Sequence, residues 1–195
     1  MPYFILVVAY LIGALPFGYI LTRLLQKTDI RSLGSGNIGA TNVLRVMGWK
    51  AALPVLILDI LKGVAAVLLA KAVSNLPGIY LGAGLMAMIG HSFPLFLGFK
   101  GGKAAATGIG VLAAVSGWVT LALIIWAGLI IVLTRYVSMG SIVGALSVPL
   151  FFWLFGYDLS HIFFGVGIAL LVTLRHKANI ARLFKGIEPK LGQKA

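Results

Sequence analysis

Long runs without charge dominate this chain. Residues 2–22 and 104–134 contain no Asp, Glu, Lys or Arg, and residues 136–174 contain only Asp158. Because a helix rises about 1.5 Å per residue, roughly 20 apolar residues cross the hydrocarbon core of a bilayer. With 61% apolar and 10% charged residues, the chain is predicted to be an all-α integral membrane protein with a single domain over residues 1–195.

The apolar runs predict seven transmembrane helices. Three spans are separate runs, at residues 2–22, 51–70 and 72–99. The two longer runs exceed one crossing and are expected to form hairpins that bend near Ser116–Gly117 and near Gly156–Asp158. Basic loops stay cytoplasmic, which puts the N-terminus outside and the C-terminus in the cytoplasm. All but Lys62 and Lys71 of the 16 Lys and Arg residues then lie on the cytoplasmic side.

Composition narrows the function classes. Cysteine is absent, so no disulfide framework or thiolate nucleophile is expected. The net charge of +12 lies mostly on one side of the membrane, which favours anionic lipid head groups or phosphorylated substrates over nucleic acid. The N-terminal run lacks a basic start and a small-residue cleavage site, so a retained anchor is expected rather than a signal peptide. The protein is expected to be a monomer in contact with membrane lipids.

Three polar, glycine-rich segments share the predicted cytoplasmic side, at residues 34–45, 91–103 and 175–188. Glycine lets backbone N–H groups approach an anion, and Arg binds phosphate through two parallel bonds. Taken alone, Gly101–Lys103 also suits a plain turn, and the basic tail from residue 175 suits a lipid-facing helix. The coincidence of all three on one face predicts a divided site for phosphorylated ligands.

Neither a metal site nor a nucleotide P-loop is predicted. Only Asp29 and Glu188 offer carboxylates near these segments, too few to hold Mg²⁺ or Zn²⁺. The sequence Gly102–Lys103 is followed by Ala104, and residue 97 is leucine, so the P-loop spacing fails.

Asp59 and Lys62 are charges inside a predicted span. Their i, i+3 spacing places them on one helix face, and ionisable residues at that depth must pair or line a polar cavity. A structural ion pair that ties this helix to its neighbours is favoured over the alternative, a wall of the substrate pocket. His91 and His176 suit structural hydrogen bonds at the interface, whereas His161 is expected on the opposite face.

The three segments, together with RYVSMGS at residues 135–141, resemble the motifs of the bacterial membrane-bound acyl-phosphate:glycerol-3-phosphate acyltransferase family. The motifs occur in the same order with matching spacing, and the resemblance covers nearly the whole chain. It implies a seven-helix membrane protein with its motifs on the cytoplasmic side. The chain departs from the family at Ala104, where the family usually has glycine, which adopts a positive φ without strain.

The resemblance implies acyl transfer from a fatty acyl phosphate to the 1-hydroxyl of glycerol 3-phosphate, giving lysophosphatidic acid and inorganic phosphate. This is the first acylation of phospholipid synthesis, at the cytoplasmic face of the bacterial inner membrane, and it requires no coenzyme A, metal or other cofactor. The alternative is a transporter or channel for a small organic phosphate. A transporter needs polar contacts near the midplane and on both faces, and the outer side of this chain has little polarity.

The resemblance also assigns roles to individual residues. The expected catalytic residues are Ser35, Arg45, Lys103, His176 and Asn179. The expected substrate-binding residues are Gly34, Gly36, Asn37, Thr41, Asn42, Gly101, Gly102 and Ser141. Arg45 and Lys103 are expected to hold phosphate charge, with Gly101 and Gly102 offering backbone donors. Glu188 is expected to be structural and to pair with a loop arginine.

Two mechanisms stay open at this point. In one, Ser35 is acylated first, with a histidine as base. In the other, both substrates bind together, the hydroxyl attacks directly, and the phosphate leaving group accepts the proton. Direct transfer is favoured because no Ser-His-Asp set is readable, and Asp29, although near in sequence, has no evident role.

Overall fold

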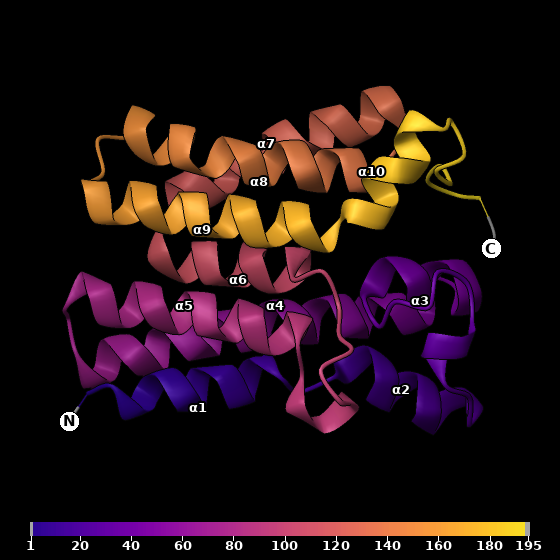
Figure 1. Cartoon of the computed structure of the whole chain (residues 1–195), viewed down its shortest axis with the longest axis horizontal. Helices are drawn as coiled ribbons and strands as arrows, with labels where there is room; N and C mark the ends of the chain where they lie inside the picture. Colours follow the sequence, from indigo (N-terminus) through magenta and orange to yellow (C-terminus); the bar gives the residue numbers. More distant parts are fainter. Residues whose placement is uncertain (1, 194–195) are drawn as a thin grey trace.

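The computed structural model describes residues 2–193, which form an all-helical bundle (Figure 1). The α-helices are α1 (Phe4–Gly13), α2 (Phe17–Gln26), α3 (Ala40–Met47), α4 (Trp49–Val73), α5 (Pro77–Ser92), α6 (Ala105–Val115), α7 (Gly117–Thr134), α8 (Val137–Leu154), α9 (Leu159–Arg175) and α10 (Lys177–Phe184). Two short 3-10 helices are η1 (Ile30–Ser32) and η2 (Leu95–Leu97).

Within residues 2–193, five segments are long and apolar enough to cross a membrane, at residues 4–26, 49–73, 77–97, 117–134 and 137–154. A sixth is present if α9 and α10, which meet at a 62° bend, count as one span. Large apolar side chains point outward along these helices, including Trp118, Val132 and Phe163. Such an outer surface suits lipid rather than water.

The helices lie in two groups, with α1, α4 and α5 on one side, α7, α8 and α9 on the other, and α6 between them (Figure 1). The polar segments gather at one end, here called the motif end, which carries α2, η1, α3 and α10 (Figure 1). The helix breaks predicted within the two long uncharged runs are present. Ser116 separates α6 from α7, and residues 155–158 separate α8 from α9.

The first predicted span is not one continuous helix. It divides into α1 and α2 at Pro16, because proline disfavours helical geometry in the residue before it and has no N–H to donate. The carbonyl of Leu15 at the break accepts a hydrogen bond of 3.2 Å from the Phe17 N–H and a second of 2.8 Å from the Lys62 ammonium of α4. Lys62 is itself 2.7 Å from Asp59 Oδ1, so the buried ion pair also supports the break.

Helices α4 and α6 approach closely through glycine. A Cβ at Gly63 would overlap the Thr107 carbonyl, and one at Gly110 would overlap the Ile60 carbonyl. Small residues that let backbones meet are the usual basis of helix association in membranes. The pair α4–α6 thereby fixes the position of α6, whose first residues follow the second motif.

Replacing Gly110 with alanine is expected to lower the free energy of unfolding by about 1–3 kcal/mol, because the added methyl group must push α6 away from α4. Gly128→Ala on α7 is a matched control, since nothing lies within 4 Å of a Cβ there. That control is expected to leave stability unchanged or to raise it by up to about 1 kcal/mol through helix propensity. Thermal unfolding in detergent followed by circular dichroism measures both, and equal melting temperatures would contradict the close-packing argument.

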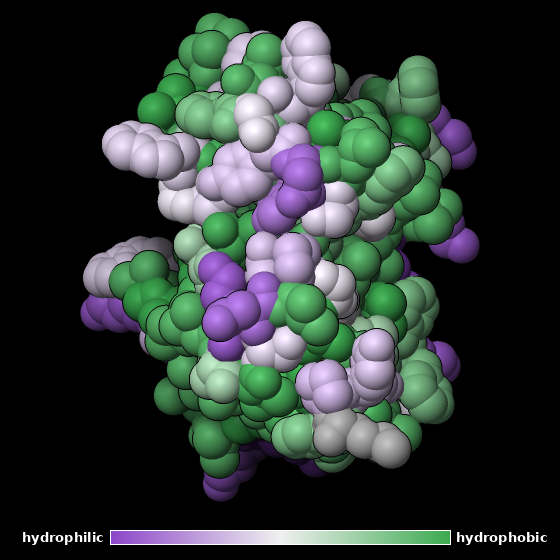
Figure 2. All heavy atoms as spheres, turned by 90° about the vertical axis from the view of Figure 1, so that its left-hand side faces the viewer, coloured by the Kyte–Doolittle hydropathy of each residue, from purple (hydrophilic) through white to green (hydrophobic). Residues whose placement is uncertain are grey.

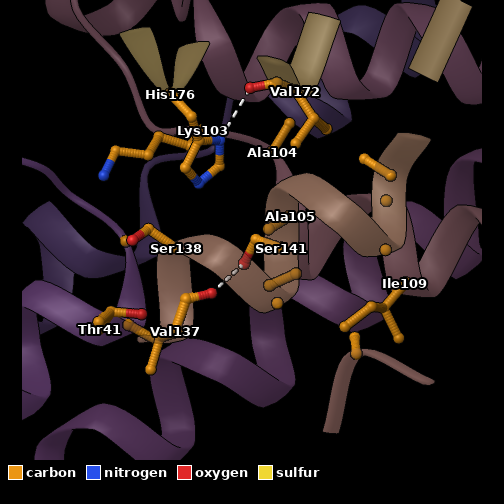
Figure 3. Close-up of a pocket in the computed structure, with 18 of the residues that line it drawn as sticks. Thr41, Lys103, Ala104, Ala105, Ile109, Val137, Ser138, Ser141, Val172 and His176 are labelled. Carbon is orange, nitrogen blue, oxygen red and sulfur yellow. Dashed lines mark hydrogen bonds between the residues drawn. The ribbon is translucent and has the colours of Figure 1, made fainter. Parts of the chain in front are cut away.

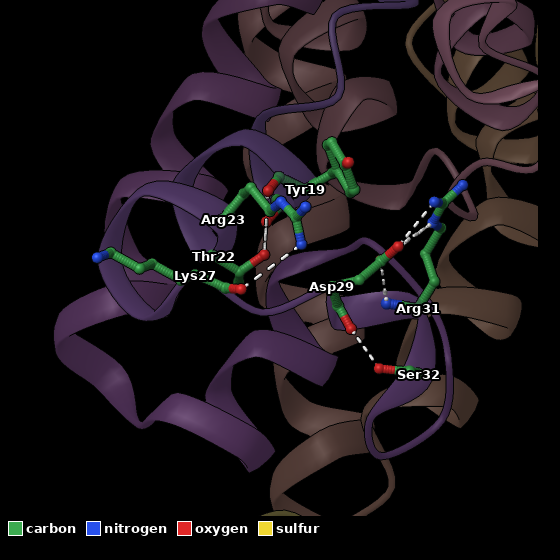
Figure 4. Close-up of polar contacts among 8 residues, drawn as sticks. Tyr19, Thr22, Arg23, Lys27, Asp29, Arg31 and Ser32 are labelled. Atoms are coloured by element: carbon green, nitrogen blue, oxygen red, sulfur yellow. Dashed lines mark hydrogen bonds and ion pairs between the residues drawn. The ribbon is translucent and has the colours of Figure 1, made fainter.

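The segment between α2 and α3 is shaped by polar contacts (Figure 4). The Asp29 carboxylate accepts a hydrogen bond of 2.9 Å from the Arg31 backbone N–H and pairs with the Arg31 guanidinium at 2.7 Å. The Ser32 hydroxyl donates to the Asp29 carbonyl at 2.8 Å. Asp29, which had no evident role from sequence, therefore closes the turn that leads into the first motif.

Figure 2 shows the opposite end of the bundle, whose surface is mostly hydrophobic with small hydrophilic patches. His161 lies there, as expected, at the start of α9. Its Nδ1 is 2.9 Å from Asp158 Oδ1, and its Nε2 is 3.1 Å from the Tyr80 hydroxyl. This buried histidine ties α5 to α9 at a distance from all three motifs.

Candidate functional site

A cavity of about 290 Å³ opens at the motif end and continues between the helices. Five expected catalytic residues line its polar part: Ser35, Arg45, Lys103, His176 and Asn179. Asn37, Thr41, Asn42, Ser141 and Glu188 line it as well. Three segments that are far apart in sequence thus meet around one space, with Thr41, Lys103, Ser141 and His176 drawn in Figure 3.

The remainder of the cavity is an apolar arm between α6, α7, α8 and α9. Its walls include Leu112, Leu123, Val148 and Ile168. Along α7 the lining runs from Thr120 to Ile131, a length of about 16 Å at the helical rise. Ile124 also lines the arm while its side chain is 51% exposed, so the arm reaches the lipid-facing surface.

A second, more polar cavity of about 210 Å³ adjoins the first at the motif end. Its basic lining residues are Lys103, Arg175, Lys177 and Arg182. Ser35, Asn37, Lys103 and Asn179 line both cavities. Gly36 lines only the second one, and Gly34, Gly101 and Gly102 line neither. Lys103 is the cation that the two cavities share.

The first motif is organised by Asn42 rather than by its glycines alone. The Asn42 amide oxygen accepts from the Ser35 backbone N–H at 2.8 Å. Its amide nitrogen donates to the carbonyls of Leu33 at 3.0 Å and Asn37 at 2.8 Å. The buried Asn42 was expected to bind substrate, but these bonds use its amide to shape the loop that presents Ser35. Gly34 and Gly36 adopt positive φ of 56° and 70°, which explains glycine there.

The glycines of the second motif pack against His91. The Gly102 N–H donates to the His91 carbonyl at 3.0 Å, so it is not free to bind phosphate as expected. A Cβ at Gly101 would overlap the same carbonyl, and one at Gly102 would overlap His91 Nε2. Close approach is therefore what requires glycine at both positions. Ala104 adopts a left-handed conformation at φ 59° despite its side chain, so the departure from the family keeps a glycine-like turn.

Lys103 and His176 have shifted pKa values. Burial lowers the pKa of Lys103 to about 8; Glu188 opposes this shift, and the nearby charges of Arg182, Arg45 and Arg175 add to it. Burial likewise lowers the pKa of His176 to about 4, so its imidazole is neutral near pH 7. His176 Nδ1 lies 2.8 Å from the Val172 carbonyl and must donate to it (Figure 3). The neutral ring therefore offers Nε2 as an acceptor.

Glu188 joins the third motif to α8 through hydrogen bonds. It accepts hydrogen bonds from Ser138 at 2.7 Å, Asn179 at 2.6 Å and Arg182 at 2.7 Å. Burial favours its neutral form, but these bonds outweigh burial and hold the pKa of the Glu188 carboxyl below its usual value. Its arginine partner belongs to α10 and not to a loop, which corrects the expectation. Ser138 was missed, although its position three residues before Ser141 puts both on one helix face.

The remaining expected residues have other contacts. The Arg45 guanidinium donates to the Pro189 carbonyl at 3.2 Å, which joins the first motif to the end of the third. The Ser141 hydroxyl donates to the Val137 carbonyl at 2.9 Å within its own helix (Figure 3). Asp59 lines the cavity while it pairs with Lys62, so its position fits both a structural ion pair and a wall of the substrate pocket.

Among residues 2–193, no group of three or more metal-ligating side chains comes together.

The family model and the relatives that match this chain are all described as glycerol-3-phosphate acyltransferases. Residues 3–186 match the family model described as glycerol-3-phosphate acyltransferase. A glycerol-3-phosphate acyltransferase of Desulforamulus reducens is 48% identical over 97% of this chain and 95% of its own length. One of Thermoanaerobacter pseudethanolicus is 47% identical over 96% and 94%.

Solved structures agree with these sequence matches. The crystal structure of PlsY, an integral membrane glycerol 3-phosphate acyltransferase, in its glycerol 3-phosphate form superposes with a TM-score of 0.93. That match has 39% identity and covers 98% of this chain and 96% of the other. The lysophosphatidic acid form superposes with a TM-score of 0.90 at 38% identity, over 98% and 95%.

Proposed function

Because this chain belongs to the glycerol-3-phosphate acyltransferase family, we propose that it transfers a fatty acyl group from acyl phosphate to the 1-hydroxyl of glycerol 3-phosphate. The products are lysophosphatidic acid and inorganic phosphate. The related PlsY structures hold glycerol 3-phosphate and lysophosphatidic acid, which are a substrate and a product of this reaction.

The observation that carries the proposal is the meeting of an apolar and a basic cavity at Lys103. A fatty chain suits the apolar arm, and glycerol 3-phosphate, which is small and anionic, suits the basic cavity. An acyl phosphate whose chain fills the arm would bring its carbonyl and phosphate to the shared residues. Lys103 supplies charge there, Asn179 and Ser35 supply hydrogen bonds, and Arg45 adds charge from the wall of the first cavity.

Direct transfer fits the side chains around this junction. The hydroxyl oxygen attacks the acyl carbonyl carbon, the bond from that carbon to the phosphate oxygen breaks, and phosphate departs with the bonding electrons. A histidine with a pKa of about 4 is a weak base, whereas a phosphate dianion takes up a proton near pH 6. The departing phosphate is therefore the better proton acceptor, and His176 Nε2 orients the hydroxyl. Among the described residues, no hydrogen bond joins the Ser35 hydroxyl to a histidine.

The topology proposed for this single domain is seven spans, with the motif end in the cytoplasm and the protein in the bacterial inner membrane as a monomer. Helix α6 counts as the fourth span, although its 11 residues give only about 16 Å of helix. It ends at Ser116, where α7 begins, and α7 runs back along the bundle (Figure 1), which supports two passes here. The start of α1 and helix α10 lie at opposite ends of the bundle, which supports an odd number of passes (Figure 1).

A transporter for a small organic phosphate is the second candidate. The apolar arm argues against it, because a phosphate path would need polar contacts toward the opposite end. Reconstitution into vesicles with palmitoyl phosphate and glycerol 3-phosphate separates the two. Lysophosphatidic acid is the expected product, and phosphate uptake without that product would favour transport.

Direct transfer makes a separate prediction about Ser35. Incubation with labelled palmitoyl phosphate alone, followed by mass spectrometry of the Ser35 peptide, is expected to show no acyl adduct. Ser35→Ala is expected to retain slow but measurable transfer, because the hydroxyl orients substrate and is not acylated. A Ser35 adduct that glycerol 3-phosphate converts to product would establish the two-step route instead.

A further inference from the structure

His91 is the one histidine of the motif end that the proposed reaction leaves unused. It lies near the end of α5, where its side chain is buried. Its backbone carbonyl accepts the Gly102 N–H at 3.0 Å, and its ring lies so close to Gly102 that a Cβ there would overlap Nε2. Main chain and side chain of His91 thus form the surface on which the residue before Lys103 rests.

The other side of the His91 ring faces a buried carboxylate. Nδ1 is 3.5 Å from Asp59 Oδ1, and it has no closer polar partner among residues 2–193. The Lys62 ammonium lies 2.7 Å from the same oxygen and also binds the Leu15 carbonyl. Asp59 is therefore held between an ammonium and an imidazole, in a helix that also packs tightly on α6. At 3.5 Å the contact between the imidazole and this carboxylate is electrostatic and not a hydrogen bond, and the fixed carboxylate favours the ring orientation that turns Nδ1 toward it.

The loop is also gripped from the side of α9. The Arg175 guanidinium donates to the carbonyls of Gly101 at 3.0 Å and Gly102 at 3.1 Å. With Gly102 also bonded to His91, the residues before Lys103 are held on two sides by buried or half-buried side chains. Lys103 then extends from a fixed backbone into the space shared by both cavities.

We propose that His91, oriented by Asp59, is a positioning residue that holds the Gly101–Gly102 segment and, through it, the Lys103 ammonium at the junction of the two cavities. The inference rests on the proposed function and deepens it. It differs from a role for His91 as a base, because Nδ1 faces Asp59 and Gly102 lies against Nε2. On this proposal, the buried Asp59–Lys62 pair of α4 contributes to the reaction by positioning His91, as well as to stability.

His91→Asn tests the proposal, since it removes the ring beneath Gly102 but leaves the Asp59–Lys62 pair in place. We expect kcat/KM for glycerol 3-phosphate to fall roughly 10²-fold, the usual effect of misplacing a reacting group by about 1 Å. Adding His91→Asn to Lys103→Met should cause no further loss, because the histidine acts through the lysine. Losses that multiply in the double variant, or a His91→Asn enzyme with unchanged kcat/KM, would overturn the proposal.

Two further measurements keep the test independent of folding. Gly102→Ala perturbs the same contact from the loop side and should give the same loss and the same lack of additivity with Lys103→Met. The matched control is His161→Asn, which breaks the contact of the buried His161 ring with the exposed Asp158 carboxylate at the opposite end and should leave kcat/KM unchanged. If the unmodified enzyme forms no lysophosphatidic acid, the proposed function fails, whatever the variants do.

The pH profile gives a readout that a purely structural histidine would not move. In the proposed reaction kcat/KM falls at alkaline pH as Lys103 loses its proton. Loosening the loop should expose Lys103 to water and raise its pKa, so this fall should move to higher pH in both His91→Asn and Gly102→Ala. A fall that stays at the same pH in both variants would show that neither contact acts on the lysine.

Discussion

Replacing Lys103 with methionine is expected to lower kcat/KM for glycerol 3-phosphate by about 10³-fold, which is the upper range for losing one preorganised charge or donor. Lys103 is the only lysine that lines both cavities among the described residues. Its ammonium would stabilise negative charge as it builds on the departing phosphate, and methionine fills a similar volume without charge. Initial rates of lysophosphatidic acid formation in vesicles measure the effect.

Lys100→Met is the matched control for this change. Lys100 belongs to the same loop, is exposed and lines neither cavity. The same substitution there should leave kcat/KM within about twofold, as expected for a surface charge away from the site. Equal losses at residues 100 and 103 would mean that the overall positive charge of the loop matters, and not a placed ammonium.

The lowered pKa of Lys103 adds a pH dependence with a defined sign. In the proposed reaction the ammonium is the active form, and its pKa is about 8 instead of the ordinary 10.5. Activity should therefore be retained below pH 8 and should fall as pH rises through that value, about tenfold per unit. Lys103→Arg keeps its charge at all accessible pH values, so this limb should disappear in that variant. Persistence of the limb would assign it to another group.

Replacing Lys62 with methionine is expected to lower the free energy of unfolding by about 3–5 kcal/mol. Asp59 is 1% exposed and Lys62 is 4% exposed, so removal of the ammonium leaves a buried carboxylate without its cation. The Leu15 carbonyl at the Pro16 break also loses the ammonium donor and keeps the Phe17 N–H at 3.2 Å. Thermal unfolding in detergent, followed by circular dichroism, reports the loss.

Lys71→Met provides the comparison, because Lys71 lies on the same helix and donates to the Ala114 carbonyl at 2.6 Å without a carboxylate partner among residues 2–193. The Lys71 ammonium also lies 5.0 Å from the Tyr80 ring centroid. Its loss should lower stability by about 1.5–3 kcal/mol, the usual value of a hydrogen bond to a charged group, because it leaves no buried carboxylate behind. The double variant Asp59→Asn/Lys62→Met should recover much of the lost stability, since it leaves no buried charge. A double variant as unstable as Lys62→Met would show that the Leu15 bond, and not the ion pair, carries the effect.

Much of the fold followed from the pattern of charge along the chain. Uncharged runs predicted the main helices, and the hairpin bends at Ser116 and near Gly156 were correct, because small and turn-forming residues interrupt the runs there. The helix break at Pro16 was missed because the run around it is uniformly apolar, and the proline was the single residue that indicated a break. The donor that supports the broken helix, Lys62, is 47 residues away.

The sequence by itself determined the class of protein, the family and the residue types of the site, because composition, motif order and charge placement are local properties. Only the tertiary structure decided which of these side chains face the cavity. Asn42 and Gly102 belong to the motifs, yet both donate hydrogen bonds to backbone carbonyls and so shape the protein rather than bind substrate. Ser35 and Lys103 instead line the space that the two cavities share. The physical reason is that buried polar groups must be paired, and the partners come from helices whose approach no local pattern encodes.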